Sequence, residues 1–150
     1  MKNIANNNGD LMTHKYLKEL GSLPYPFNQK DYPEPDDEYG FDTRETYELI
    51  WYLVAIIYER LRYFQDGEPN EIIDFTFYKF DIHGETLTQE ECIERMVRCC
   101  RIYLDDISEE FDEGEMEEMN IALKDEASIK NEAVKELFYI LGEVAPTMWW

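Results

Sequence analysis

The sequence predicts a mainly α-helical (α+β) protein, a compact bundle of four to five helices around a buried central helix at 43–65, with one small β-hairpin near 80–87. Three observations support this prediction. The densest apolar run, Leu49 to Tyr58, has charged residues at both ends. Apolar residues recur at helical spacing in two later segments. Before these two segments, a loosely alternating run rich in Ile and Phe is interrupted by His83-Gly84, which is typical of a hairpin turn.

The first forty residues lack helical periodicity and carry Pro24, Pro26, Pro33 and Pro35. We therefore expect residues 1–40 to form an extended, partly disordered arm rich in Pro and Tyr, and residues 41–150 to form one globular, α-dominated domain. The aromatic residues of the arm are expected to pack over the core helix, the alternative being an adhesive surface for a partner. They are Tyr25, Phe27, Tyr32, Tyr39 and Phe41.

The central helix has a predicted start and a predicted stop. Asp42 is the expected N-cap, with Glu45 as its capping-box partner, and Gly67 followed by Pro69 marks the end. At 100° per residue, one narrow strip is polar and the rest of the circumference is apolar, which predicts burial by several neighbours. The strip contains Glu45, Glu48, Tyr52, Ala55, Glu59, Arg62 and Asp66. The apolar run is shorter than the roughly 20 residues that a bilayer requires.

The hairpin prediction includes a register. A two-residue turn pairs Ile82 with Glu85 and places Phe80 opposite Leu87. Because two strands alone are only marginally stable, the hairpin is expected to pack on helices.

Two further helices follow the hairpin. Thr88 opens the first, with Glu91 completing a capping box, and the second is expected to run from Asn131 as N-cap to a stop at Pro146. The predicted apolar stripe of the first is Ile93, Met96, Val97, Cys100, Leu104 and Ile107; that of the second is Val134, Leu137, Phe138, Leu141 and Val144.

Charge limits the possible functions. The chain carries 34 acidic and 14 basic residues, a formal net charge of −20. Direct binding to nucleic acid phosphates or to an anionic membrane is therefore excluded as a main activity, and a charged partner should be basic. No stretch resembles a signal peptide, and three cysteines do not form a disulfide framework, so a cytoplasmic protein with cysteines as apolar fillers is expected. His14 and His83 lack ligand-spaced partners, and we expect no cofactor.

Two acidic runs are candidate partner-binding surfaces. Clustered carboxylates can imitate a nucleic acid backbone, which carries one charge per about 1.7 Å of duplex, and can occupy a Lys/Arg groove. The alternative is a solvated acidic loop that keeps the protein soluble. The main run lies within 105–118 and contains Asp105, Asp106, Glu109, Glu110, Asp112, Glu113, Glu115, Glu117 and Glu118. The secondary run contains Asp31, Glu34, Asp36, Asp37 and Glu38.

A family resemblance rests on three features: the Asp-x-Arg-Glu-Thr-aromatic opening at residues 42–47, the segment YKFDIHGETLTQEECIERM, and a closing apolar helix before a double Trp. In residues 41–104 and 132–150 the chain resembles a group of small acidic proteins of phages and prophages. The resemblance implies a phage or mobile-element origin and action in a host cytoplasm. It favours a non-enzymatic inhibitor that blocks a basic, nucleic-acid-binding host defence protein, such as a restriction or CRISPR nuclease, by charge mimicry of DNA.

Two alternatives stay open. One is an immunity protein that neutralises a specific toxin, since such proteins are also small, acidic and aromatic-rich. The other is an enzyme: EECIE and EEFD resemble the acidic motif of all-α, MazG-type nucleotide pyrophosphohydrolases, in which carboxylates hold Mg²⁺. By that resemblance the ligands are Glu90, Glu91, Glu94, Glu109 and Asp112. Arg98 and Arg101 count against it, because they can neutralise Glu94 and Glu90. A monomer and a homodimer are both compatible with the sequence.

Overall fold

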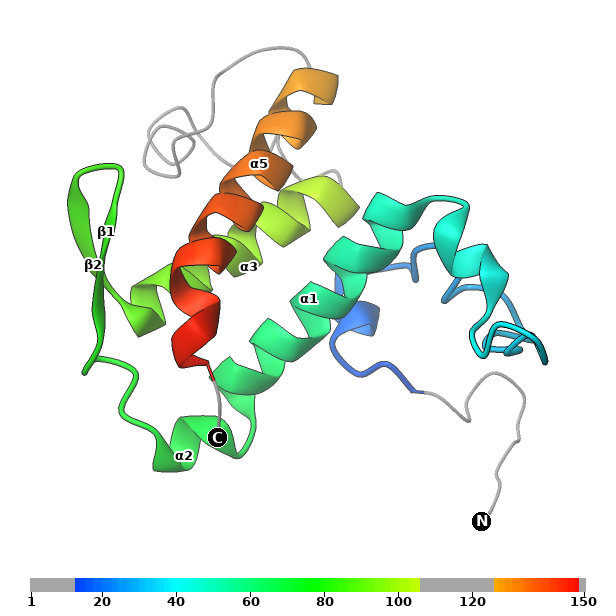
Figure 1. The fold of residues 1–150 in the computed structure, drawn as a ribbon, viewed down its shortest axis with the longest axis horizontal. Coiled ribbons are helices and arrows are strands. Elements are labelled where there is room, and N and C mark those ends of the chain that lie inside the picture. Colours follow the sequence, from blue (N-terminus) through cyan, green and yellow to red (C-terminus); the bar gives the residue numbers. More distant parts are fainter. Residues whose placement is uncertain (1–12, 106–125, 149–150) are drawn as a thin grey trace. The chain divides into compact units, whose positions relative to one another are not determined.

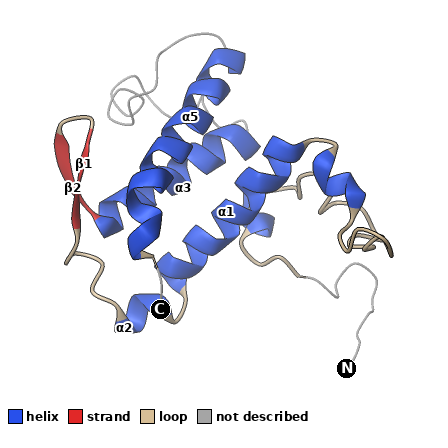
Figure 2. Cartoon of the chain, viewed as in Figure 1, coloured by secondary structure: helices blue, strands red, loops and turns tan. Residues whose placement is uncertain are grey.

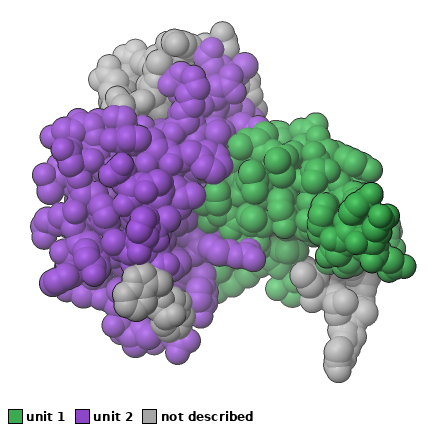
Figure 3. All heavy atoms as spheres, viewed as in Figure 1, with its two compact units in different colours: residues 1–59 green, residues 60–150 purple. Residues whose placement is uncertain are grey.

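The computed structural model describes residues 13–105 and 126–148. Contacts divide the chain into two compact units, Met1–Glu59 (unit 1) and Arg60–Trp150 (unit 2), shown in Figure 3. The sequence analysis instead separates residues 1–40 from residues 41–150. The division falls inside a helix, so that helix contributes its first part to unit 1 and its last turns to unit 2.

The described residues are mainly helical and contain one two-stranded antiparallel hairpin, as predicted (Figures 1 and 2). They include three long helices and a one-turn helix, so a bundle of four to five helices is not confirmed. The α-helices are α1 (Leu49–Asp66), α2 (Pro69–Ile72), α3 (Gln89–Asp105) and α5 (Glu126–Val144), the strands are β1 (Lys79–Ile82) and β2 (Glu85–Thr88), and 3-10 helices span Leu17–Leu20, Thr43–Thr46 and Ala145–Thr147.

The predicted start of the central helix is wrong and its predicted stop is confirmed. The Asp42 side chain caps the 3-10 helix Thr43–Thr46, and α1 begins only at Leu49. Glu45 accepts a hydrogen bond from the Tyr32 hydroxyl at 2.7 Å, so it does not close a capping box. At the other end the Gly67 amide donates to a carbonyl of the last turn of α1, and the helix ends one residue before this glycine.

In unit 1, part of the strip that was predicted to be polar contacts the N-terminal segment. Phe27 stacks on Tyr52 with ring centroids 5.8 Å apart and an interplanar angle of 9°. Ala55 is fully buried, and Glu59 Oε2 lies 2.8 Å from His14 Nδ1. The helical wheel treats these positions as solvent-facing because it contains no information about the segment that packs on them. The expectation that Phe27 covers the helix is confirmed.

Burial of α1 is less complete than predicted. The fully covered side chains of the helix are Val54, Ala55, Tyr58 and Leu61. Trp51, Leu53, Ile56 and Ile57 are only half-buried. The helix α1 therefore has one buried face and one partly exposed face, whereas the sequence predicts burial around most of its circumference.

In unit 2, the hairpin has the predicted register, with Phe80 opposite Leu87 and Ile82 opposite Glu85. His83 and Gly84 both have positive φ angles, 53° and 81°. Positive φ at both central positions is the requirement of a type I′ turn, whose twist matches that of the flanking strands.

The α3 helix begins with the predicted capping box. The Glu91 amide donates to Thr88 Oγ1 at 3.1 Å, and Glu91 Oε1 accepts from the Thr88 amide at 2.8 Å. The two helices α3 and α5 pack side by side, with β2 against α3 and β1 against α5. The residues they bury are Cys92, Ile93, Met96, Val97, Cys99, Cys100 and Ile102 of α3 and Ile129, Ala133, Glu136, Leu137, Ile140 and Val144 of α5.

Two predictions about the last helix are wrong and one is confirmed. Asn131 lies within α5, which begins at Glu126, and Phe138 is exposed although it was placed on the apolar stripe. The buried face is offset toward Ala133 and Ile140 because it follows the contact with α3 and the hairpin. The helix ends at Val144, before Pro146, as predicted.

The three cysteines are free and buried, as expected of apolar fillers. Burial raises the pKa of the Cys92 thiol to about 11 and raises that of Cys99 and Cys100 further. These thiols therefore stay protonated at neutral pH and are weak nucleophiles.

The capping box allows a direct test. Replacing Thr88 by Ala is expected to lower the free energy of unfolding by about 1 kcal/mol, because the hydroxyl that accepts the Glu91 amide is lost. Urea denaturation measures the change. Thr86→Ala on the exposed face of β2 is the matched control, and an equal loss there would show that the effect does not come from the cap.

Candidate partner-binding surfaces

The main predicted acidic surface falls outside the described residues. Asp105 is the last residue of α3, and Asp106, Glu109, Glu110, Asp112, Glu113, Glu115, Glu117 and Glu118 lie in the part that is not described. This surface remains a prediction from the sequence.

The secondary surface belongs to a hydrogen-bonded loop of unit 1, residues 31–42. The Asp36 amide donates to the Phe41 carbonyl at 2.9 Å, and the Gly40 amide donates to the Asp36 carbonyl at 2.8 Å. Asp36 Oδ1 also accepts from the amides of Glu38 and Tyr39, at 2.8 and 3.1 Å. Asp31, Glu34, Asp36, Asp37 and Glu38 are all exposed. The acidic side chains are thus displayed on a backbone with defined internal contacts.

Asp42 and Arg44 anchor this loop. Asp42 is 3% exposed, and its Oδ2 accepts from the Glu34 amide and from Arg44 Nη2, at 2.8 and 2.7 Å. Its Oδ1 accepts from the amide and from Nε of Arg44, both at 3.0 Å. The hydrogen bonds from the Arg44 guanidinium hold the pKa of the Asp42 carboxyl far below its usual range. The buried Asp42 carboxylate therefore links the backbone at Glu34 to the last residue of the loop.

Arg44 also reaches the acidic surface itself. Its Nη1 donates to Asp31 Oδ1 at 2.6 Å, and this bond lowers the pKa of Asp31. The single positive charge of Arg44 is thus shared between Asp42 and Asp31. The exposed carboxylates that Arg44 does not contact are Glu34, Asp36, Asp37 and Glu38.

Large aromatic side chains are exposed around the same loop. Tyr39 is 61% exposed, Phe41 43% and Tyr47 67%, and the rings of Tyr39 and Phe41 lie 6.4 Å apart. Because Tyr39 and Phe41 are exposed, the expectation that they pack over the core helix is wrong. The two residues flank Gly40, whose φ of 85° turns the chain. Carboxylates beside exposed aromatics make a surface suited to a basic partner, because aromatic residues are enriched at the centres of protein interfaces.

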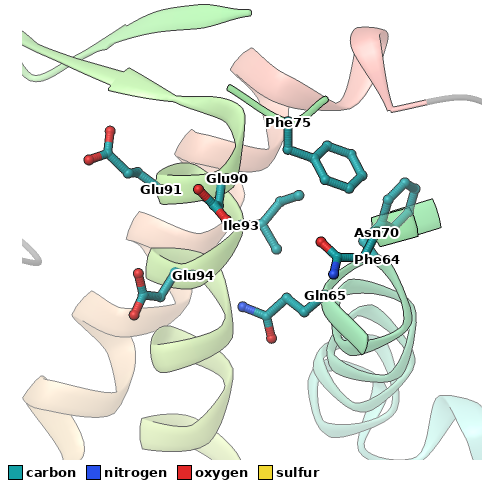
Figure 4. Close-up of a pocket in the computed structure, with 8 residues that line it drawn as sticks. All are labelled: Phe64, Gln65, Asn70, Phe75, Glu90, Glu91, Ile93 and Glu94. Carbon is teal, nitrogen blue, oxygen red and sulfur yellow. The ribbon is translucent and has the colours of Figure 1, made fainter. Parts of the chain in front are cut away.

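Unit 2 contains a pocket of about 350 Å³ that includes three residues of the alternative magnesium site (Figure 4). Its lining residues are Phe64, Gln65, Asn70, Phe75, Glu90, Glu91, Ile93 and Glu94. Glu91 is engaged in the capping box, and Glu94 Oε2 lies 3.6 Å from Arg98 Nη2, as predicted. In Figure 4 the side chains of Glu91 and Glu94 point away from the two phenylalanines.

The remaining parts of the magnesium hypothesis are weaker. Glu109 and Asp112 lie outside the described residues, and within the described part no cluster of His, Cys, Asp and Glu is arranged to hold a metal ion. The predicted pairing of Arg101 with Glu90 is wrong, because eleven residues of helix separate them by about 16 Å. The buried Arg101 Nε has no hydrogen-bond partner among the described residues.

A second polar group of unit 2 was missed by the sequence analysis. His83 Nε2 lies 2.8 Å from Oε1 of Glu136, a residue of α5 that is 5% exposed, and the imidazole stacks on Tyr139 at 4.5 Å. The position of His83 in the turn was predicted. Its partner was not, since nothing in the sequence indicates a contact between residues 53 apart.

No protein-family model, curated protein or solved structure matches the chain. Among the described helices, none is both long and apolar enough to cross a membrane.

Proposed function

We propose that the chain is a non-enzymatic acidic binding protein that blocks a basic, nucleic-acid-binding protein by offering carboxylates in place of nucleic acid phosphates. The observation that carries the proposal is the loop of residues 31–42, where exposed carboxylates and exposed aromatics share one hydrogen-bonded segment. The net charge of −20 supports it. A phage origin, suggested by the sequence resemblance, makes a host defence nuclease the preferred target.

The mechanism has two parts. The excess negative charge steers a basic partner toward the surface and accelerates association, an effect that salt screens. The exposed aromatics near the loop, Tyr39, Phe41 and Tyr47, bury apolar area at the contact and slow dissociation. Binding should therefore be salt-dependent chiefly in its association rate.

The first experiment is affinity capture from bacterial lysate on the immobilised full chain, with elution first by duplex DNA and then by salt. If duplex DNA releases a nucleic-acid enzyme, this supports competition between the DNA and the chain for the same groove of that enzyme. A partner that DNA does not displace would favour toxin-specific recognition, and the mimicry proposal would then be wrong.

Charge reversal tests which surface is used. The changes Glu34→Lys, Asp37→Lys and Glu38→Lys together are expected to weaken binding of the captured partner at least tenfold, which corresponds to about 1.4 kcal/mol. Asp36 is left intact because its side chain holds the turn. The set Glu109→Lys, Glu110→Lys, Asp112→Lys and Glu113→Lys tests the main run in the same assay.

The matched control is Glu68→Lys, Glu71→Lys and Glu143→Lys, three exposed positions in unit 2 that alter the net charge by the same amount as the loop variant. If the control weakens binding as much as the loop variant, total charge and not the loop is responsible. If none of the variants weakens binding, both acidic surfaces are excluded as the interface. Circular dichroism confirms that each variant is folded.

A further inference from the structure

We propose that the pocket of Figure 4 binds a guanidinium group, either of a small molecule or of an arginine side chain of a protein. The site lies within unit 2, between the end of α1, α2 with the loop after it, and the start of α3. It shares no residue with the acidic loop of unit 1 and goes beyond the proposed function.

One wall of the pocket is aromatic. Phe64 from the end of α1 and Phe75 from the loop after α2 meet edge to face, with ring centroids 5.8 Å apart and an angle of 67°. Phe75 and the adjacent Ile93 are buried, so this wall is held in place by the interior of the unit. Aromatic faces attract cations, and most strongly cations that are weakly hydrated.

The rest of the lining is acidic or amide, and none of the eight lining residues is basic. Glu91 and Glu94 are engaged by the capping box and by Arg98. Glu90 forms no ion pair with any described residue, is exposed, and lines the pocket together with both phenylalanines. Glu90 is therefore the carboxylate available to a cation that rests on the phenylalanines.

The amides complete the lining. Gln65 Oε1 already accepts from Arg62 Nη1 at 3.1 Å, so this carbonyl is occupied. The Asn70 side chain makes no hydrogen bond to a described residue, and its carbonyl oxygen is a second acceptor at the pocket. One carboxylate, one amide oxygen and an aromatic wall can receive a planar group with several N–H donors.

Other ligand classes fit this lining less well. A phosphate would meet three carboxylates among the lining residues, and the two arginines next to them, Arg62 and Arg98, already contact Gln65 and Glu94. A metal ion requires convergent oxygens, whereas the side chains of Glu91 and Glu94 diverge from the aromatic wall (Figure 4). An ammonium group is compact and strongly hydrated, whereas a guanidinium is flat, stacks on aromatic rings and forms paired hydrogen bonds with a carboxylate.

The test uses the full chain and a pair of probes of equal charge, butylguanidinium and butylammonium. We expect butylguanidinium to bind saturably, as measured by the NMR shifts of the backbone amides of Ile93 and Asn70. Butylammonium is expected to bind at least fivefold more weakly. Glu90→Gln should weaken butylguanidinium binding at least tenfold. Phe64→Leu, which keeps an apolar wall without the aromatic face, should weaken it several-fold.

The matched control is Glu71→Gln, an exposed carboxylate of α2 that does not line the pocket. Absence of saturable binding, equal binding of the two probes, or equal weakening by Glu71→Gln and Glu90→Gln would overturn the proposal. A short Gly/Ser peptide with one arginine identifies the source: tighter binding than butylguanidinium favours a protein side chain, and weaker binding favours a small molecule. Glu90 is not changed in any of the charge-reversal variants. If the pocket does not bind a guanidinium, the test of the acidic loop is therefore unaffected.

Discussion

Asp42→Ala is expected to lower the free energy of unfolding by about 3 kcal/mol, the lower end of the loss seen when a buried ion pair is broken on one side. The substitution removes the acceptor of two backbone amides, those of Glu34 and Arg44, and leaves the Arg44 guanidinium without its buried partner. Urea denaturation at pH 7 measures the loss. Asp37→Ala, at an exposed position of the same loop, is the matched control and should change stability by less than about 0.5 kcal/mol.

The same carboxyl makes stability depend on pH. Its pKa is lower in the folded chain than its ordinary value of 3.8, chiefly because of the hydrogen bonds from Arg44. A carboxyl with a lowered pKa stabilises the fold above its unfolded pKa, and that contribution is lost as the pH falls through the folded value. The stability difference between the wild type and Asp42→Asn should therefore be largest above about pH 4 and shrink in more acidic solution.

Two results would contradict this account. If the difference between wild type and Asp42→Asn stays constant from pH 7 to pH 2.5, the charge of Asp42 does not contribute. If Asp42→Ala costs no more than Asp37→Ala, the loop does not depend on its buried anchor. In either case the acidic loop would lose the preorganisation on which the proposed interface depends.

Several features that depend on residues a few positions apart were predicted correctly. The His83-Gly84 turn, the hairpin register and the Thr88–Glu91 capping box each depend on residues a few positions apart, and all three are confirmed. The end of α1 before Gly67 is of the same kind. Short-range rules work here because the interacting groups are neighbours in the chain.

Errors arose where contacts outside the expected motif decide the outcome. Asp42 was expected to cap α1, but its side chain caps the 3-10 helix Thr43–Thr46 and also accepts a hydrogen bond from the Glu34 amide. Tyr52 and Glu59 were placed on a polar strip, but Phe27 stacks on Tyr52 and His14 lies against Glu59. Helical periodicity describes one helix and contains no term for the segment that packs on it.

The candidate surfaces show the same limit. The exposed acids of 31–38 were identified from composition alone, because charged side chains rarely enter a core unless they are paired. The pocket around Glu90 was reached only through a motif resemblance, and its aromatic wall, Phe64 and Phe75, comes from segments that no motif links to it. The main acidic run lies outside the described residues and remains a prediction.

His83→Gly is the second substitution with a large expected effect, a loss of about 2 kcal/mol in the free energy of unfolding. Glycine accepts the φ of 53° at this position, so the loss does not arise from backbone strain. It arises because the buried Glu136 loses its partner, while its other oxygen, Oε2, already has none among the described residues. Stacking of the imidazole on Tyr139 is lost as well.

A double-mutant cycle separates the hydrogen bond from the stacking. In a Glu136→Leu background no buried carboxylate remains, so His83→Gly should cost only about 1 kcal/mol, the contribution of the aromatic contact. A coupling energy near zero would show that the pair does not hold the hairpin to α5. Because an isolated two-stranded hairpin is marginally stable, amide exchange of β1 and β2 should accelerate in His83→Gly before that of α3 does. Equal acceleration in the hairpin and in α3 would mean that the substitution acts on unit 2 as a whole.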